Sequence, residues 1–157
     1  ATCSKIAHHP CPTYGIAWGR SICVSGDDKR VVFYSVEGNV EHVFDHKDSM
    51  KESPTCASFN PAGETVVVGN LNCFSCYSWN KKENKWEEDS KNVVENMYSV
   101  TAFAWKANGS MLAVGTVCGL LDIYGACIRR YIYKNTFEIT YVSQSQVLIR
   151  HKDDIQL

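Results

Sequence analysis

One arrangement of short strands recurs three times along this chain of 157 residues. In each copy an apolar segment ends in an aromatic residue, a turn follows, a second apolar segment ends in glycine, and a third ends in an aromatic. The first aromatic residues of the three copies are Trp18, Phe59 and Trp105, which lie 41 and 46 residues apart. A group of three strands that recurs at this spacing predicts a small sheet repeated along the chain.

The residues between the strands favour antiparallel hairpins. Asn60-Pro61-Ala62-Gly63 and Asn108-Gly109 stand between the first two strands of copies two and three, and both combinations are typical of tight turns. No window shows the apolar spacing of an amphipathic helix. A fourth, outer strand is predicted after each third strand, at Val40–Phe44, Trp86–Glu88 and Cys127–Tyr133.

Repeated sheets of roughly 40–45 residues are typical of WD40 propeller blades. We therefore predict an all-β fold, a WD40-type β-propeller with about three blades plus the start of a following strand unit. Residues 1–135 would hold the last blades of a propeller, and residues 136–157 the start of the next blade or of a second propeller. The alternative is a β-sandwich, which also uses many short strands but does not repeat them as a unit.

Three blades are too few for a closed ring, since closed propellers have about 4–8. An open set would leave bare sheet edges. We therefore expect these residues to be a partial propeller within a longer polypeptide.

The bulk composition bears on the kinds of partner. The net charge of −1 argues against a large nucleic-acid surface. The best membrane-span candidate, Met111–Ile128, contains Asp122 and three glycines, so we expect no transmembrane segment.

The eight cysteines do not form a recognisable framework, and we expect free thiols. Cys73-x-x-Cys76 lies in a predicted strand, where side chains three apart point to opposite faces, and no second pair follows with the spacing of a zinc site. The histidines of His8-His9 and His42-x-x-x-His46 are expected to be solvated. We therefore expect no metal site and no cofactor.

The chain lacks a nucleophile elbow, a phosphate-binding loop and a His-Glu-x-x-His motif. We expect no catalytic residues and a non-enzymatic protein. Arginine and aromatic side chains are enriched at binding hot spots. Two clusters are therefore interface candidates, with a solvated blade edge as the alternative for both. They are Lys81, Lys82 and Lys85 with Trp86, and Arg129 and Arg130 beside Tyr131, Tyr133 and Lys134.

Several segments are more specific than a general blade pattern. They are His9–Pro12, Trp86–Glu88, Thr101–Lys106, Asn108–Ser110, Val114–Gly119, Arg129–Asn135 and Phe137–Val142. Through them the chain resembles the N-terminal WD40 region of the intraflagellar transport protein 172 family. Asp27–Tyr34 also resembles the end of a WD40 blade, with Tyr34 where many repeats have tryptophan.

The resemblance implies a scaffold subunit of intraflagellar transport complex B, which mediates protein–protein contacts in ciliary transport trains and in cilium assembly. It implies other complex B subunits as partners within a large hetero-oligomer. It implies a location in the cilium, at the axoneme and basal body, and in the cytoplasm. The family has no catalytic residues to carry over.

The chain departs from the common blade pattern at one turn. The aspartate expected after the second strand is present as Asp28 in the first copy, while Leu71 and Val117 take its place in the others. Two alternatives remain. One is a WD40 scaffold of another assembly, such as a vesicle coat, and the other is a cysteine- or metal-dependent enzyme.

Overall fold

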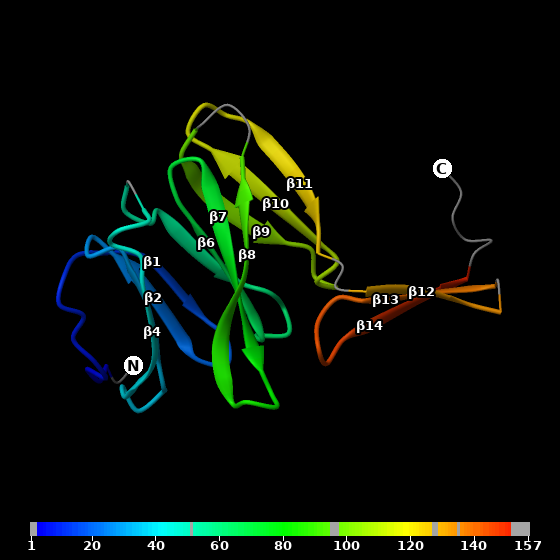
Figure 1. The fold of residues 1–157 in the computed structure, drawn as a ribbon, viewed down its shortest axis with the longest axis horizontal. Coiled ribbons are helices and arrows are strands. Elements are labelled where there is room, and N and C mark those ends of the chain that lie inside the picture. The colour runs from blue at the N-terminus through cyan, green and yellow to red at the C-terminus, as the bar shows by residue number, and fades with distance from the viewer. Residues whose placement is uncertain (1–2, 51, 95–97, 127–128, 135, 152–157) are drawn as a thin grey trace.

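The computed structural model describes residues 3–50, 52–94, 98–126, 129–134 and 136–151. These residues form fourteen strands in four antiparallel sheets, and no helix occurs among them (Figure 1). Nothing in the described ranges is therefore a helix that could cross a membrane. The prediction of an all-β fold is confirmed.

The first two sheets are four-stranded blades in which each strand pairs with the next strand along the chain. The first contains β1 (Thr13–Trp18), β2 (Ile22–Gly26), β3 (Arg30–Tyr34) and β4 (Val40–Asp45). The second contains β5 (Cys56–Phe59), β6 (Thr65–Gly69), β7 (Cys73–Asn80) and β8 (Lys85–Val93). The outer strands predicted for these two blades are present as β4 and β8.

The last two sheets have three strands each. The third blade contains β9 (Val100–Trp105), β10 (Met111–Thr116) and β11 (Leu121–Gly125). The fourth unit contains β12 (Arg129–Tyr133), β13 (Phe137–Tyr141) and β14 (Val147–His151).

The outer strand predicted for the third blade at Cys127–Tyr133 is wrong in its pairing. Its described part is β12, which pairs with β13 and not with β11. Tyr131 lies opposite Ile139 and Tyr133 opposite Phe137. Such aromatic and β-branched cross-strand pairs stabilise a hairpin directly. The sequence pattern identifies a strand here but does not choose between two neighbours that are both close along the chain.

The predicted turns between the first two strands are confirmed in copies two and three. Gly63 and Gly109 have φ angles of 70° and 71°, in the left-handed region that favours glycine. The Asn60 side-chain oxygen accepts hydrogen bonds from the backbone N–H groups of Glu64 and Thr65, at 3.1 Å each. These turns reverse the chain tightly enough for the first two strands of each copy to pair as an antiparallel hairpin.

Two hydrophobic clusters lie between successive blades. Val66 and Val68 on β6 pack with Phe33 of the first blade, whereas Val67 packs with Leu112 and Val114 of the third. Because side chains alternate along a strand, β6 buries one face against each neighbouring blade. The second blade is therefore a wedge between two others, which is the packing of a propeller and not that of a two-layer sandwich.

The first strands of the three blades, β1, β5 and β9, lie next to one another. Their side chains are small at the closest approach, since a Cβ built on Gly15 would lie 3.3 Å from the Ala57 Cβ. These strands take the innermost position of each blade, nearest to the axis of a propeller.

The fourth unit meets the rest of the molecule through the turn between β13 and β14. Gln144 Nε2 donates a hydrogen bond to the Trp79 carbonyl oxygen at 3.0 Å, and Ser145 Oγ donates one to Glu64 Oε2, also at 3.0 Å. Val142 and Ser143 in the same turn are buried. The three strands themselves extend away from the blades (Figure 1).

Candidate interaction surface

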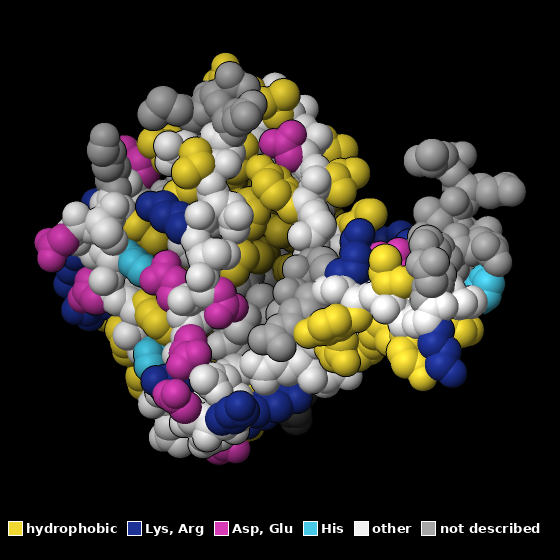
Figure 2. Space-filling view, turned by 45° about the vertical axis from the view of Figure 1, so that its right-hand side comes forward, with side chains coloured by type: hydrophobic (Ala, Val, Ile, Leu, Met, Phe, Trp, Pro, Cys, Tyr) yellow, Lys and Arg dark blue, Asp and Glu magenta, His cyan; other side chains and the backbone are white. Residues whose placement is uncertain are grey.

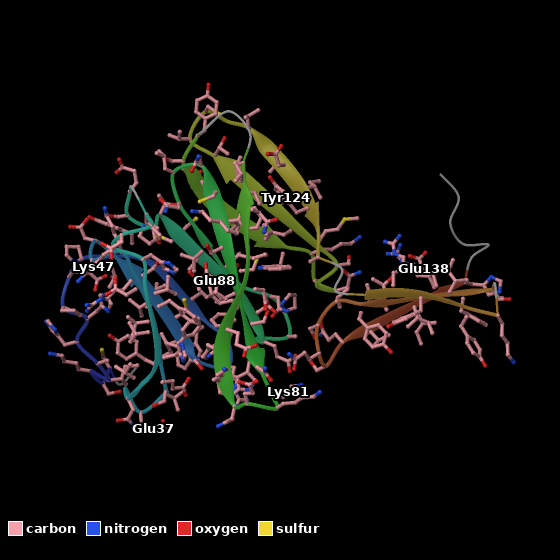
Figure 3. The ribbon with its side chains drawn as sticks, in the orientation of Figure 1. Glu37, Lys47, Lys81, Glu88, Tyr124 and Glu138 are labelled. Atoms are coloured by element: carbon pink, nitrogen blue, oxygen red, sulfur yellow. The ribbon has the colours of Figure 1, made fainter. Side chains whose placement is uncertain are left out.

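The predicted lysine cluster lies at the tip of the β7–β8 hairpin, where Lys81 is labelled in Figure 3. Lys81 Nζ lies 2.7 Å from Glu64 Oε1. Lys85 pairs with Glu83, and its Nζ lies 3.3 Å from Glu87 Oε1. The hydrogen bonds that Lys85 donates to these two glutamates raise its pKa. Most of the positive charge at the tip is therefore paired within the chain. Little of it is left to attract an acidic partner.

Trp86 is not available for contact, contrary to the prediction. Its side chain is 1% exposed and stacks on Phe33 at a centroid distance of 4.3 Å. Its indole N–H donates a hydrogen bond to Ser21 Oγ at 3.1 Å. The side chain of Trp86, the second residue of β8, points inward and closes the core between the first and second blades. Trp86 holds two blades together instead of binding a partner.

The predicted arginines begin β12. Arg129 lies opposite Tyr141 in the strand register. Arg130 Nε donates to Glu138 Oε1 at 2.9 Å, and its side chain is exposed. Glu138, labelled in Figure 3, comes from the neighbouring strand β13. This ion pair lies on one face of the fourth unit.

The other face of the fourth unit is mostly apolar, and the register places Arg129 and His151 at its ends. Residues directly opposite in the register share a face, and the register places aromatic and aliphatic side chains together. We call this set the aromatic face: Tyr131, Tyr133, Phe137, Ile139, Tyr141, Val147 and Ile149. The opposite face carries Arg130, Ile132, Glu138, Thr140, Leu148 and Arg150.

The aromatic face is open to solvent. Tyr131 is 51% exposed and Ile149 67% exposed, and every other member except Ile139 is also exposed. Figure 2 shows hydrophobic side chains gathered on this projecting unit. Soluble proteins rarely expose a contiguous apolar surface unless it binds something. Tyrosine contributes rigid apolar area with a polar tip, which suits a protein interface.

Sequence reasoning found only part of the aromatic face. It named Tyr131 and Tyr133 as neighbours of the arginines, but not Phe137, Tyr141 or Ile149. The signal was the alternation of apolar residues along Phe137–Tyr141 and Val147–His151. That alternation becomes one surface only when the register of β12, β13 and β14 is known.

Apolar side chains are also exposed on the outer faces of the first and third blades. On β1, Ile16 and Trp18 are 67% and 68% exposed, on the side away from the second blade. On β11, Leu121 and Ile123 are 69% and 67% exposed, again away from the second blade. On the second blade, the equivalent faces are the ones that pack against the neighbouring blades.

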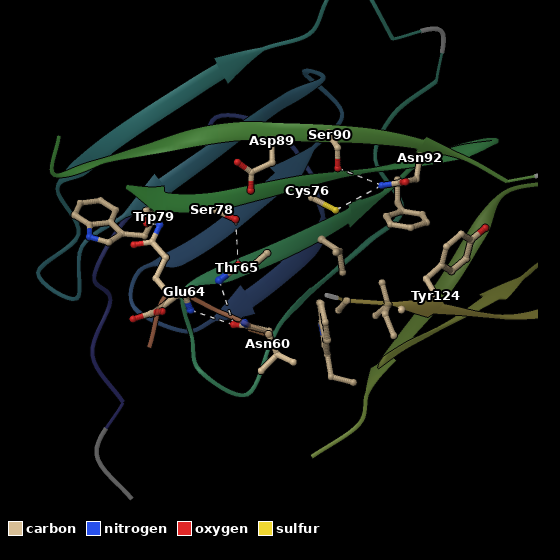
Figure 4. A pocket seen from close by; sticks show the side chains of 18 residues that line it. Asn60, Glu64, Thr65, Cys76, Ser78, Trp79, Asp89, Ser90, Asn92 and Tyr124 are labelled. Atoms are coloured by element: carbon tan, nitrogen blue, oxygen red, sulfur yellow. Dashed lines mark hydrogen bonds between the residues drawn. The ribbon is translucent and has the colours of Figure 1, made fainter. Parts of the chain in front are cut away.

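A cavity of about 480 Å³ lies between the second and third blades (Figure 4). Phe74, Leu112 and Tyr124 give it an apolar wall. Several of its polar groups bond to one another: Thr65 Oγ1 and Ser78 Oγ lie 3.1 Å apart, and Asn92 Nδ2 donates to Ser90 Oγ at 3.3 Å. The volume suits a small ligand, but the hydrogen bonds among its lining groups already use several of the polar side chains. We assign it no chemistry.

Glu64, on the rim of this cavity, joins the second blade to the fourth unit. Burial acts to raise the pKa of Glu64, but hydrogen bonds from Lys81 and Ser145 outweigh burial and lower it. The carboxylate therefore stays ionised and keeps both contacts at neutral pH.

The structure places two of the histidines differently from the prediction. His9 and His46 are 7% and 12% exposed, not solvated. His46 Nε2 lies 2.8 Å from the Tyr77 hydroxyl, and His9 Nδ1 lies 3.0 Å from the Tyr34 hydroxyl. Aromatic neighbours cover both rings, which the linear spacing of the histidines does not reveal.

The seven described cysteines are free thiols, and Cys127 lies outside the described residues. Cys73 is buried in β7 and Cys76 is half-buried. Burial raises the pKa of the Cys76 thiol, which opposes formation of a reactive thiolate. Nothing in this pair resembles a redox site.

Comparison with known proteins identifies close relatives in sequence. No family model matches the chain. It is 43% identical over 149 residues to the "Intraflagellar transport protein 172 homolog" of Danio rerio and 43% identical over 151 residues to "Intraflagellar transport protein 172" of Chlamydomonas reinhardtii. These alignments cover 94% and 95% of the chain. The chain spans about 8% of the length of each of these relatives.

Comparison with solved structures concerns the fold. The computationally designed Ika4 protein and Saccharomyces cerevisiae Sqt1 each give a TM-score of 0.60, at 12% and 14% identity. The alignments cover 96% and 84% of this chain, and 99% and 42% of those chains. With the wedge-like packing of the blades, these likenesses confirm the predicted WD40-type propeller fold.

Proposed function

This chain belongs, by homology to one segment of its members, to the intraflagellar transport protein 172 family, and we propose that it is part of a non-enzymatic scaffold subunit of intraflagellar transport complex B. The names of its relatives support a role in intraflagellar transport. In this role the chain mediates protein–protein contacts in ciliary transport trains and in cilium assembly. It acts by presenting rigid surfaces to other proteins.

One observation carries this mechanism: the aromatic face is exposed on a unit that extends from the blades. Propeller blades hold their edges and turns in fixed positions, because each blade is buried against its neighbours. A partner that covers Tyr131, Tyr141 and Ile149 would bury aromatic area in one step, which is how hot spots contribute most of the affinity. The paired lysines and the buried Trp86 have no part in this mechanism.

The proposed partners are other complex B subunits, within a large hetero-oligomer and without nucleic acid. The proposed locations are the axoneme and basal body of the cilium, and the cytoplasm. We also propose that residues 1–135 hold the last blades of a propeller and that residues 136–157 lead into the next blade or a second propeller. The β12–β13 hairpin spans the position of this division.

Live imaging tests the proposal. The natural-length protein that contains this chain is tagged and followed in ciliated cells. We expect particles that move along the axoneme in both directions, and short or absent cilia when the protein is depleted. A tagged protein that collects on vesicle coats and never moves in cilia would contradict the proposal and favour a coat scaffold.

A further inference from the structure

Three side chains that can bind a metal ion meet at the first blade. They are His9 and Cys11, from the segment before β1, and Asp28, from the turn between β2 and β3. One ligand atom from each lies within 4.8 Å of the other two. His9 Nε2 lies 3.7 Å from Asp28 Oδ1.

The sequence explains why these groups face one another. His9 precedes Pro10 and Cys11 precedes Pro12, and a residue before proline is held in an extended conformation. The segment is tied to the turn by a hydrogen bond from the Asp27 N–H to the Pro12 carbonyl oxygen at 3.0 Å. The backbone N–H of Asp28 donates to Cys11 Sγ at 3.4 Å, so the sulfur already accepts from the turn.

The cluster contains buried polar atoms without hydrogen bonds. The side chains of His9 and Asp28 are 7% and 15% exposed. Within the described part of the chain, neither His9 Nε2 nor Asp28 Oδ2 makes a hydrogen bond. Leaving buried polar atoms in this state costs about 1–3 kcal/mol each. When Nδ1–H donates to the Tyr34 hydroxyl oxygen, the free lone pair on Nε2 faces the carboxylate, and a cation between them would satisfy both.

We propose that His9 Nε2, the Cys11 thiolate and the Asp28 carboxylate bind one zinc ion, with a solvent molecule as fourth ligand. Zinc favours this mixture of nitrogen, sulfur and oxygen ligands at about 2.0–2.3 Å, which places neighbouring ligand atoms roughly 3.5 Å apart. The separation of 3.7 Å between His9 and Asp28 fits that geometry. The hydrogen bond from Nδ1 to Tyr34 is the kind of outer contact that orients a zinc-bound histidine. The Cys11 proton leaves to solvent on binding.

Such an ion would cross-link the segment before β1 to the β2–β3 turn at the edge of the first blade. Ala7, just before the ligands, packs on the cluster formed by Ile22, Val24, Val32 and Tyr34. The ion would join the segment that carries Ala7 to the β2–β3 turn and hold it on this apolar surface. The site is separate from the aromatic face, so it adds to the proposed function and does not depend on it.

Metal titration of the natural-length protein tests the proposal. Zinc binding is followed by calorimetry, and cobalt is used as a spectroscopic probe because a thiolate ligand gives a charge-transfer band. The test variants are Cys11→Ser and His9→Gln, and their matched controls are the exposed neighbours Cys3→Ser and His8→Gln. Serine at position 11 can still accept the Asp28 N–H, so this variant is expected to fold.

We expect saturable binding of one zinc ion. Changing an outer partner of a metal ligand costs 10–100-fold in affinity, so loss of a ligand in Cys11→Ser or His9→Gln should weaken binding by at least about 100-fold. The cobalt charge-transfer band should disappear in Cys11→Ser and remain in Cys3→Ser. Binding that Cys11→Ser and His9→Gln leave unchanged would overturn the proposal. So would the absence of saturable binding, which would mean that His9 and Asp28 form an ordinary imidazole–carboxylate pair.

Discussion

The indole of Trp86 joins two blades through its apolar ring and through its N–H group. Its ring stacks on Phe33 of the first blade, and its N–H reaches Ser21 beside β2. Arg20 adds a further contact, with its guanidinium 4.2 Å from the centre of the Trp79 ring. Large aromatic side chains in such positions account for much of the stability of an interface between elements. Trp86 is therefore a major contributor to the contact between the first and second blades.

Replacing Trp86 should show how much its side chain contributes to stability. We expect Trp86→Ala to lower the free energy of unfolding by about 3–5 kcal/mol, because it leaves a cavity in the core and removes a buried hydrogen bond. The measurement is chemical denaturation of this chain of 157 residues. The matched variant Trp18→Ala, at a residue 68% exposed, should change the free energy by no more than about 0.5 kcal/mol. Equal effects would contradict the assigned positions.

The cysteines should differ sharply in reactivity. Burial raises the pKa of the Cys23 and Cys76 thiols, whereas Cys3 and Cys118 are exposed. Brief alkylation of the native protein at neutral pH, mapped by mass spectrometry, should label Cys3 and Cys118 first and leave Cys23 unmodified. Rapid labelling of Cys23 or Cys76 would show that the β2 and β7 strands are not packed as described.

At the scale of elements, the sequence predicted the strands and turns that depend on residues close together along the chain. The strands of each copy and the turns at Gly63 and Gly109 follow from alternation and turn residues within a few positions of each other. The partner of β12 does not, because β11 and β13 are both reachable and the alternation fits either. The aromatic face was missed for the same reason. The burial of Trp86 and His9 depends on residues from other strands, which spacing along the chain does not reveal.

The contact of the fourth unit with the second blade should depend on pH. The folded-state pKa of Glu64 is lowered, so its contribution is present above the ordinary value of 4.5 and is lost as pH falls through the folded pKa. We expect protection of the 142–146 turn from proteolysis at neutral pH and its loss under acid conditions below that value. The variant Glu64→Gln should be equally cleavable at both pH values. A wild-type turn whose cleavage does not change would count against this contact.

At the scale of the molecule, the three blades form a stack with two open ends. The outer faces of the first and third blades expose apolar side chains such as Trp18 and Ile123, while β6 in the second blade is buried on both of its faces. Blade packing could be anticipated from the repeat, because each unit has apolar residues on both sides of its middle strands. The position of the fourth unit could not, because it depends on side-chain contacts between residues far apart in the sequence.

The open ends lead to a prediction for the natural-length protein. We expect further blades to cover Ile16 and Trp18, as the second blade covers its neighbours. Hydroxyl-radical footprinting should therefore oxidise Trp18 readily in the chain of 157 residues and much less in the natural-length protein. Equal oxidation in both would mean that no blade packs on β1.

The most direct test of the central claim, that this chain is a scaffold acting through the aromatic face, is quantitative co-purification of complex B subunits with the natural-length protein from ciliated cells. The account predicts that the double variant Tyr131→Ser, Ile149→Ser loses most of at least one subunit. It predicts that Ile132→Ser, an equally exposed change on the opposite face, keeps them all. Full recovery of every subunit by the double variant, or no complex B subunit with the unaltered protein, would contradict it.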